Sequence, residues 1–196
     1  MNRRELIRMI AVVTGGVVVG GEFLVAGCKN PDAGPGTSFG EDDIAFLNEV
    51  ADTILPKTTG ADGKEIAGGK DAKVGQFMTV MVNDTYEKKD QDAFHAGMKT
   101  LDDACEKMHG HGFMKATPEH RKELLVALDK ERAEYQKTKK KEDPNHYFQY
   151  FKQLTIFGYF TSKEGRTTAT RYEPVPGKYI GDLDYKKGDK IFTSLQ

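Results

Sequence analysis

Residues 38–56 read SFGEDDIAFLNEVADTILP and carry a clear helical pattern. Ser38 and Glu41 have the spacing of a capping box, in which each side chain accepts a hydrogen bond from the backbone N–H of the other residue. Pro56 has no backbone N–H, so we expect the helix to end before it. Apolar residues recur every three or four positions between these two signals, which places them on one face of the helix. They are Ile44, Leu47, Val50, Ala51, Ile54 and Leu55.

The same periodicity predicts four further helices downstream. Thr117 followed by Pro118 suits an N-cap and the first helical position of one of them. Thr161 and Glu164 again have capping-box spacing and predict a short sixth helix. The four longer helices are expected at about residues 74–86, 90–108, 118–136 and 145–160.

The last portion of the chain has a different composition. Residues 173–177 read EPVPG, in which the two prolines exclude a helix and favour an extended backbone. We find no internal repeat and no alternating pattern long enough to predict a sheet. The sequence therefore predicts an all-α, bundle-like domain of five to six helices over residues 41–170, followed by an irregular, extended tail over residues 171–196.

Residues 1–27 have the features of an export signal. Arg3 and Arg4, followed by Leu6, Ile7 and Arg8, resemble the twin-arginine signal. The uncharged run that follows is short and rich in glycine for a transmembrane helix. The twin-arginine route carries proteins that are already folded, often with a cofactor or a partner. We therefore expect export to the periplasm by this route.

The end of the signal, Val-Ala-Gly-Cys at residues 25–28, resembles the lipobox of bacterial lipoproteins. Several acyl chains on Cys28 would anchor the protein stably to a membrane, and Lys29 after it favours the outer membrane. Residues 28–40, rich in Gly, Pro and small polar residues, are expected to form a flexible tether. An uncleaved signal anchor, or an apolar helix with a buried cysteine, is the alternative.

Composition excludes several functions. The 196 residues include 29 Lys and Arg against 30 Asp and Glu, a net charge of -1, whereas nucleic-acid binders carry a basic excess. The sequence has no glycine-rich phosphate-binding motif, no haem-attachment motif and no nucleophile elbow. We therefore expect no nucleic-acid partner, no cofactor of the chain's own and no catalytic residues in it.

One cluster offers metal-ligand chemistry. Cys105, Met108, His109 and His111 combine soft sulfur and imidazole groups within residues 105–111, which could hold copper. A free-standing periplasmic lipoprotein that binds a ligand or copper here is thus an alternative hypothesis. Cys105 and Met108 also lie on the apolar stripe of the third helix, and His109 followed by Gly110 is typical of a helix end. The sequence favours this structural interpretation and predicts no metal site.

Aromatic residues are concentrated in the fifth helix. They occur on nearly every side of it, which exceeds a single core-facing stripe. A partner protein would cover the surplus, although a core function alone is equally compatible with the pattern. These residues are Tyr147, Phe148, Tyr150, Phe151, Phe157, Tyr159 and Phe160.

Several stretches are similar to those of the gluconate 2-dehydrogenase subunit 3 family. They are FLNEVADTILP at residues 46–56, DAKVGQFM at 71–78 with VND at 82–84, FGYFTSKEG at 157–165 and RYEPVPG at 171–177. The resemblance spans roughly residues 40–190. It implies a non-catalytic small subunit that is needed for the export of a large flavoprotein subunit lacking its own signal.

The resemblance also implies the partners. The large subunit would be an FAD-dependent sugar, glycoside or sugar-acid dehydrogenase of the glucose-methanol-choline class, and its electrons would leave through the haem of a cytochrome c. The lipobox departs from soluble members of the family, so this chain would also anchor the complex. The residues expected to contact the flavoprotein are Tyr147, Phe157, Tyr159, Phe160, Arg171 and Tyr172.

Overall fold

The computed structural model describes residues 39–140, 142–172, 177 and 181–193, with the backbone alone for Tyr172. The signal and nearly all of the tether, including Arg3, Arg4 and Cys28, lie outside the described residues. The described helices are α2 (Glu41–Ile54), α3 (Val74–Thr85), α4 (Lys88–His109), the 3-10 helix η1 (Phe113–Lys115), α5 (Pro118–Thr138), α6 (Tyr147–Thr161) and α7 (Lys163–Ala169). The predicted all-α fold class is confirmed.

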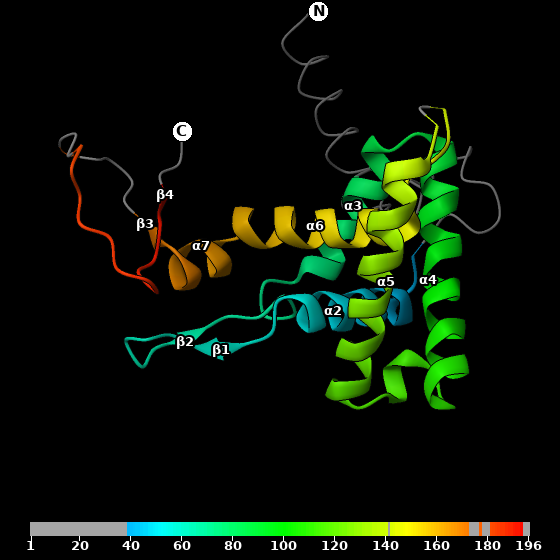
Figure 1. Ribbon diagram of the computed structural model, residues 1–196, viewed down its shortest axis with the longest axis horizontal. Coiled ribbons are helices and arrows are strands. Elements are labelled where there is room, and N and C mark those ends of the chain that lie inside the picture. Colours follow the sequence, from blue (N-terminus) through cyan, green and yellow to red (C-terminus); the bar gives the residue numbers. More distant parts are fainter. Residues whose placement is uncertain (1–38, 141, 173–176, 178–180, 194–196) are drawn as a thin grey trace, which may run out of the picture. The chain divides into compact units, whose positions relative to one another are not determined.

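Helix α6 is the centre of the packing. It contacts α2, α3, α4, α5 and α7, and α4 and α5 lie side by side against one end of it (Figure 1). Phe148, Phe151 and Leu154 of α6 are buried among these helices. The crowding of aromatics in this segment is therefore explained largely by a helix with neighbours on several sides.

The core draws one apolar face from each of the other long helices. The buried residues recur at the helical spacing seen in the sequence, since only that face is removed from water. They include Leu47 and Val50 of α2, Met78 and Val82 of α3, Phe94 and Leu101 of α4, and Leu124 and Leu128 of α5. The positions of these four helices agree with the predicted ranges.

Two of the three predicted helix caps are wrong in register. Gly40 is the N-cap of α2, and its N–H donates to Asp43 Oδ2 at 2.8 Å, so Glu41 is the first helical residue and Ser38 precedes the described part. Ser162, whose Oγ accepts from Gly165 N at 3.0 Å, caps α7 in place of Thr161. Thr117 caps α5 as predicted, accepting from His120 N at 3.3 Å.

Short strand pairs interrupt the helical fold. Strands β1 (Thr58–Thr59) and β2 (Glu65–Ile66) form an antiparallel hairpin in the loop before α3. Strands β3 (Arg171–Tyr172) and β4 (Phe192–Thr193) pair in parallel, so the described end of the tail returns to the start of the tail. Two residues are too few for alternation to appear in the sequence. No described helix has the length and hydrophobicity of a membrane span.

Candidate functional site

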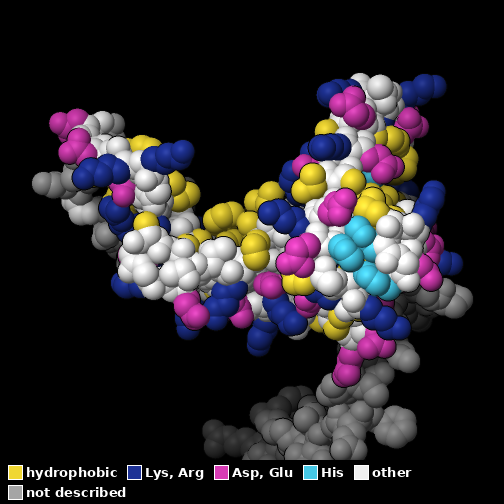
Figure 2. Space-filling model, turned by 60° about the horizontal axis from the view of Figure 1, so that its bottom comes forward, with side chains coloured by type: hydrophobic (Ala, Val, Ile, Leu, Met, Phe, Trp, Pro, Cys, Tyr) yellow, Lys and Arg dark blue, Asp and Glu magenta, His cyan; other side chains and the backbone are white. Residues whose placement is uncertain are grey.

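Four large apolar side chains on α3 and α6 are exposed to solvent. Phe157 is 50% exposed, Ile156 directly precedes it in α6, and Phe160 lies one turn further on. Val80 lies one turn after Phe77 on α3, and the Phe77 ring meets the Phe157 ring at 5.5 Å. Figure 2 shows hydrophobic side chains gathered in the middle of the view, over α6. We call Phe77, Val80, Ile156, Phe157 and Phe160 the α3–α6 apolar surface.

A glycine brings the two helices of this surface together. A Cβ atom on Gly158 would lie 2.6 Å from Phe77 Cδ1, closer than real Cβ contacts allow. The missing side chain therefore lets the Phe77 ring approach α6 closely beside Phe157. The surface is built on two packed helices rather than on a loop, which holds its side chains in place.

Tyr159, one of the predicted contact residues, is a core residue. Its side chain is only 3% exposed, and its hydroxyl donates to the Ala67 carbonyl oxygen at 2.6 Å. Burial raises the pKa of the phenol, so the hydroxyl remains a donor at neutral pH. Tyr159 joins α6 to the segment before α3 and is not part of the exposed surface.

Tyr147 lies at the other end of α6 from the apolar surface. Phe160 lies thirteen positions further along the helix, which corresponds to roughly 20 Å along the helix axis. Its ring stacks on His146 at 4.6 Å and packs over Gly97 of α4. Burial, with a smaller effect of Glu131, raises its pKa to about 12. The structure therefore does not bring Tyr147 together with Phe157 and Phe160.

Arg171 and Tyr172 lie in β3, where the tail is attached. The Arg171 N–H donates to the Ile191 carbonyl oxygen at 2.8 Å, and its guanidinium lies 4.7 Å from the centre of the Phe192 ring. Tyr172 pairs with Thr193 through the backbone. The predicted contact residues Arg171 and Tyr172 thus hold the tail against the domain.

The tail carries several exposed apolar residues. The Thr170 and Thr193 hydroxyls lie 2.8 Å apart, and Lys190 pairs with Asp62 of the β1–β2 turn at 3.4 Å. These contacts attach the tail through few groups. The exposed apolar residues are Leu183, Tyr185, Ile191 and Phe192.

The cluster considered for copper is divided by the structure. Cys105 is buried in the core, and burial raises the pKa of its thiol, which disfavours the thiolate that binds metals. Met108 was expected in the core but is 47% exposed. Among the described residues, no group of three or more His, Cys, Asp or Glu side chains could hold a metal ion.

An open groove between α2, α4 and η1 is lined by several acidic side chains. Asp102 is engaged within the fold, because its Oδ1 accepts from Phe113 N at 2.7 Å. Lys99 and Lys115 also line the groove and offset part of the negative charge. The groove is therefore a poor candidate for a cation site. The acidic residues that line it are Asp42, Asp43, Asp102 and Glu106.

Comparison with protein families gave one match. The family model described as gluconate 2-dehydrogenase subunit 3 matches residues 41–177. The chain belongs to this family. The predicted family is thereby confirmed. A search of curated proteins found no match, and neither did a search of solved structures.

The match to gluconate 2-dehydrogenase subunit 3 begins at the first residue of α2 and continues past β3. It includes the whole α3–α6 apolar surface, whereas residues 181–193 of the tail lie beyond it. Within the matched range, two of the family-like stretches meet at Asn48. Its Oδ1 accepts from Gly75 N at 2.8 Å, and its Nδ2 donates to Gln76 Oε1 at 3.2 Å. The side chain of Asn48 thus connects α2 to the start of α3 by hydrogen bonds.

Proposed function

We propose that this chain is the small, non-catalytic subunit of a dehydrogenase complex and binds an FAD-dependent large subunit. The observation that carries the proposal is the match to gluconate 2-dehydrogenase subunit 3 over residues 41–177. The sequence lacks motifs for binding a cofactor of its own, so oxidation of a sugar, glycoside or sugar acid is assigned to the FAD of the partner. Electrons would then pass to the haem of a cytochrome c.

The α3–α6 apolar surface is the proposed contact with the flavoprotein. Phe157 and Phe160 are aromatic, and aromatic side chains are enriched in the centres of protein interfaces. The exposed apolar side chains of this surface lie close together on two helices. A partner that covers them removes their apolar area from water, which favours association. The tail beyond β3, with Arg171 and Tyr172 at its base, would extend the contact.

Export and anchoring of the complex are assigned to the first 28 residues. The twin arginines Arg3 and Arg4 would direct the folded pair of subunits to the periplasm. Lipid on Cys28 would then hold the complex on a membrane, with the outer membrane favoured by Lys29. One chain would thereby supply both the export signal and the membrane anchor for a partner that has neither.

Co-purification of the full-length chain from its native host tests this proposal. We expect a larger protein with the absorbance of flavin to accompany it. Removing residues 171–196 should weaken this association. If no flavoprotein accompanies the full-length chain, the assignment of the partner is wrong. If the truncated chain retains the flavoprotein at full strength, the tail is not part of the contact.

The export signal needs its own test. Replacing Arg3 and Arg4 together by Lys should leave both subunits in the cytoplasm, because the large subunit travels with the small one. Cys28→Ser should release the exported complex from the membrane fraction. Correct localisation of either variant contradicts the corresponding assignment.

A further inference from the structure

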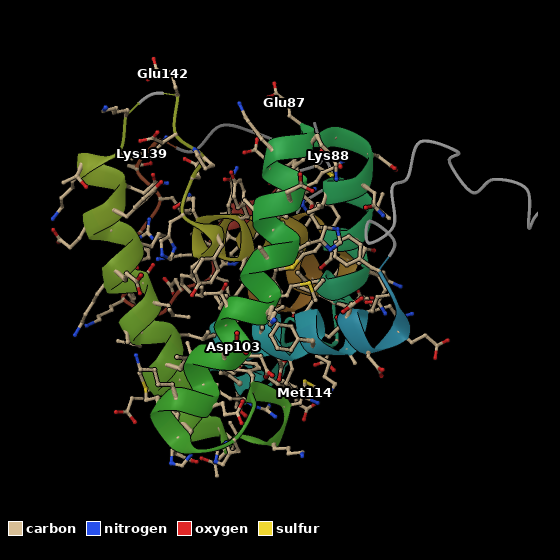
Figure 3. All side chains as sticks on the ribbon, turned by 90° about the vertical axis from the view of Figure 1, so that its right-hand side faces the viewer. Glu87, Lys88, Asp103, Met114, Lys139 and Glu142 are labelled. Carbon is tan, nitrogen blue, oxygen red and sulfur yellow. The ribbon has the colours of Figure 1, made fainter. Side chains whose placement is uncertain are left out.

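A groove opens where α5 crosses α2 and α6. These three helices contact one another, and α5 runs across the other two (Figure 1). In Figure 3, α5 lies beside α4, between Met114, which precedes it in the chain, and Lys139, which follows it. The groove has a volume of about 400 Å³, which falls within the roughly 300–1,000 Å³ of small-molecule sites in proteins. It shares no lining residue with the α3–α6 apolar surface.

The base of the groove is apolar. Leu125 of α5 and Phe148 of α6 line it and are buried, and Ile54 at the end of α2 is partly buried. Val126, the neighbour of Leu125, also lines the groove and is exposed to solvent. An apolar ligand that covers these side chains removes their apolar area from water, which favours binding.

Three lysines line the groove together with these apolar residues. Lys122 and Lys130 belong to α5, and Lys152 belongs to α6. Lys122, Val126 and Lys130 recur every four positions, so they lie on one face of α5. The groove therefore combines an apolar lining with positive charge along α5.

The acidic residue in the lining is already paired. Asp129 accepts hydrogen bonds from Lys152 Nζ at 2.8 and 2.9 Å and from Arg132 Nε at 2.8 Å. Partial burial alone would raise the pKa of the Asp129 carboxyl, but the hydrogen bonds and positive charges of Lys152 and Arg132 outweigh it and lower this pKa. Among the described residues, Lys122 and Lys130 form no ion pair. Two of the three positive charges in the lining are thus left without a paired anion.

The groove offers few partners for a ligand rich in hydroxyl groups. The Thr53 hydroxyl donates to the Glu49 carbonyl oxygen at 2.8 Å, and Asp129 is held by Lys152 and Arg132. The hydroxyl groups of such a ligand would lack partners against the apolar lining, which is unfavourable. An apolar chain with one anionic group fits both the lining and the unpaired lysines.

We propose that this groove binds a fatty acid. The apolar chain lies along Leu125, Val126 and Phe148, and the carboxylate lies at the edge of the groove within reach of Lys122 or Lys130. An ammonium group and a carboxylate form charge-assisted hydrogen bonds, and neither lysine has to leave another ion pair to form one.

A neighbouring depression on α5 is a poorer place for the carboxylate. It shares Lys122, Val126 and Lys130 with the groove but is also lined by Glu119 and Glu123, which repel an anionic group. The fatty acid is therefore placed in the groove between the helices. This site is independent of the proposed function, since a small subunit with or without a fatty acid would still match the family.

Calorimetric titration with octanoate tests the proposal. The full-length protein carries Cys28→Ser, which removes the proposed lipid so that the protein can be handled without detergent. We expect one octanoate per chain at pH 7.5 and low salt. Gluconate has a carboxylate on a hydroxylated chain, and octyltrimethylammonium has the same apolar chain with a positive charge. Each should bind at least about tenfold more weakly than octanoate.

Charge variants test the role of the lysines. Lys122→Gln combined with Lys130→Gln should weaken octanoate binding by about fivefold or more, because both unpaired charges are removed. Lys107→Gln combined with Lys187→Gln is the matched control, since it removes the same charge from exposed lysines that do not line the groove. Equal losses in the two double variants, or absence of octanoate binding to the parent protein, would overturn the proposal.

Nuclear magnetic resonance locates the site without these variants. Octanoate should shift the methyl resonances of Ile54, Leu125 and Val126 more than those of Val80 and Ile156 on the α3–α6 apolar surface. The reverse pattern would overturn the assignment to this groove. Binding to vesicles of anionic lipids without any binding of octanoate would indicate a membrane-binding face in its place and would also overturn the proposal.

Discussion

The Arg121 guanidinium of α5 forms an ion pair with the Glu49 carboxylate of α2 and at the same time donates to the carbonyl oxygens of Phe113 and Met114. The Arg121 side chain is 13% exposed, so these contacts are largely shielded from water. Lys70, in the loop before α3, adds a second ion pair to Glu49 at 3.0 Å. One arginine thus joins α2, η1 and α5.

Arg121→Ala should lower the free energy of unfolding by about 2–3 kcal/mol, because it leaves a partly buried carboxylate and two carbonyl groups without their donors. Urea unfolding followed by circular dichroism measures the loss. Lys70→Ala is the control, since this exposed pair should contribute less than about 1 kcal/mol. Equal losses in the two variants would contradict the central position assigned to Arg121.

Acid should weaken the same junction. Burial alone would raise the pKa of the Glu49 carboxyl, but hydrogen bonds and positive charge from Lys70 and Arg121 outweigh it and lower the pKa below its usual 4.5. A carboxyl whose pKa is lower in the folded state than in the unfolded state stabilises the folded protein. This stabilisation is fully present at pH values above the unfolded-state pKa. That stabilisation is lost as the pH falls through the folded-state value.

The expected outcome is a fall in the urea midpoint as the pH decreases below 4.5. Glu49→Gln should be less stable at neutral pH and should show a shallower acid dependence, because the titrating group is gone. A pH profile of the Gln variant that parallels the unsubstituted protein would show that other carboxyls dominate.

Gly158→Ala should destabilise the contact between α3 and α6. The new Cβ would lie 2.6 Å from Phe77 Cδ1, and the Phe77 ring is itself packed against Phe157. We expect a loss of about 1–3 kcal/mol from overpacking, reduced by the better helix propensity of Ala, about 1 kcal/mol. Thermal unfolding measures it.

Gly177→Ala is a suitable comparison, since a Cβ there would have nothing within 4 Å. This substitution should change stability by less than about 0.5 kcal/mol. If Gly158→Ala is as stable as the Gly177 variant, the close approach of Phe77 to α6 is not required for the fold.

Phe157→Ser and Ile156→Ser should weaken association with the flavoprotein by about tenfold or more, because they remove apolar area from the α3–α6 apolar surface. Co-purification yield or surface plasmon resonance with the isolated partner measures the effect. Val126→Ser is the control, since this α5 residue is 48% exposed and lies outside that surface. Weakening by the Val126 variant to the same degree would place the interface elsewhere.

Sequence periodicity located the helices well but their caps poorly. A helix is long enough for its apolar stripe to be recognised, whereas a cap depends on which of several nearby polar groups reaches an unpaired N–H. Thus Asp43 rather than Ser38 completes the start of α2, and Ser162 rather than its neighbour Thr161 caps α7.

The candidate surface was predictable only in part. The surplus of aromatics in α6 indicated that some of them face outward, but Tyr159 is buried while its neighbour Phe160 is exposed. That difference is set by the helices that pack around α6. Ile156 could have been found as the residue one turn before Phe160, whereas Val80 lies on another helix and had no such signal.

The sequence by itself determined the helical class and the family, and it predicts the export and lipid signals, because all of these are encoded in local spacing and short motifs. Only the tertiary structure decided which groups distant in the chain meet: Phe77 with Phe157, Arg121 with Glu49, and His120 with His109. Each of these pairs joins two helices, and their contact depends on how the helices pack and not on the spacing within either one.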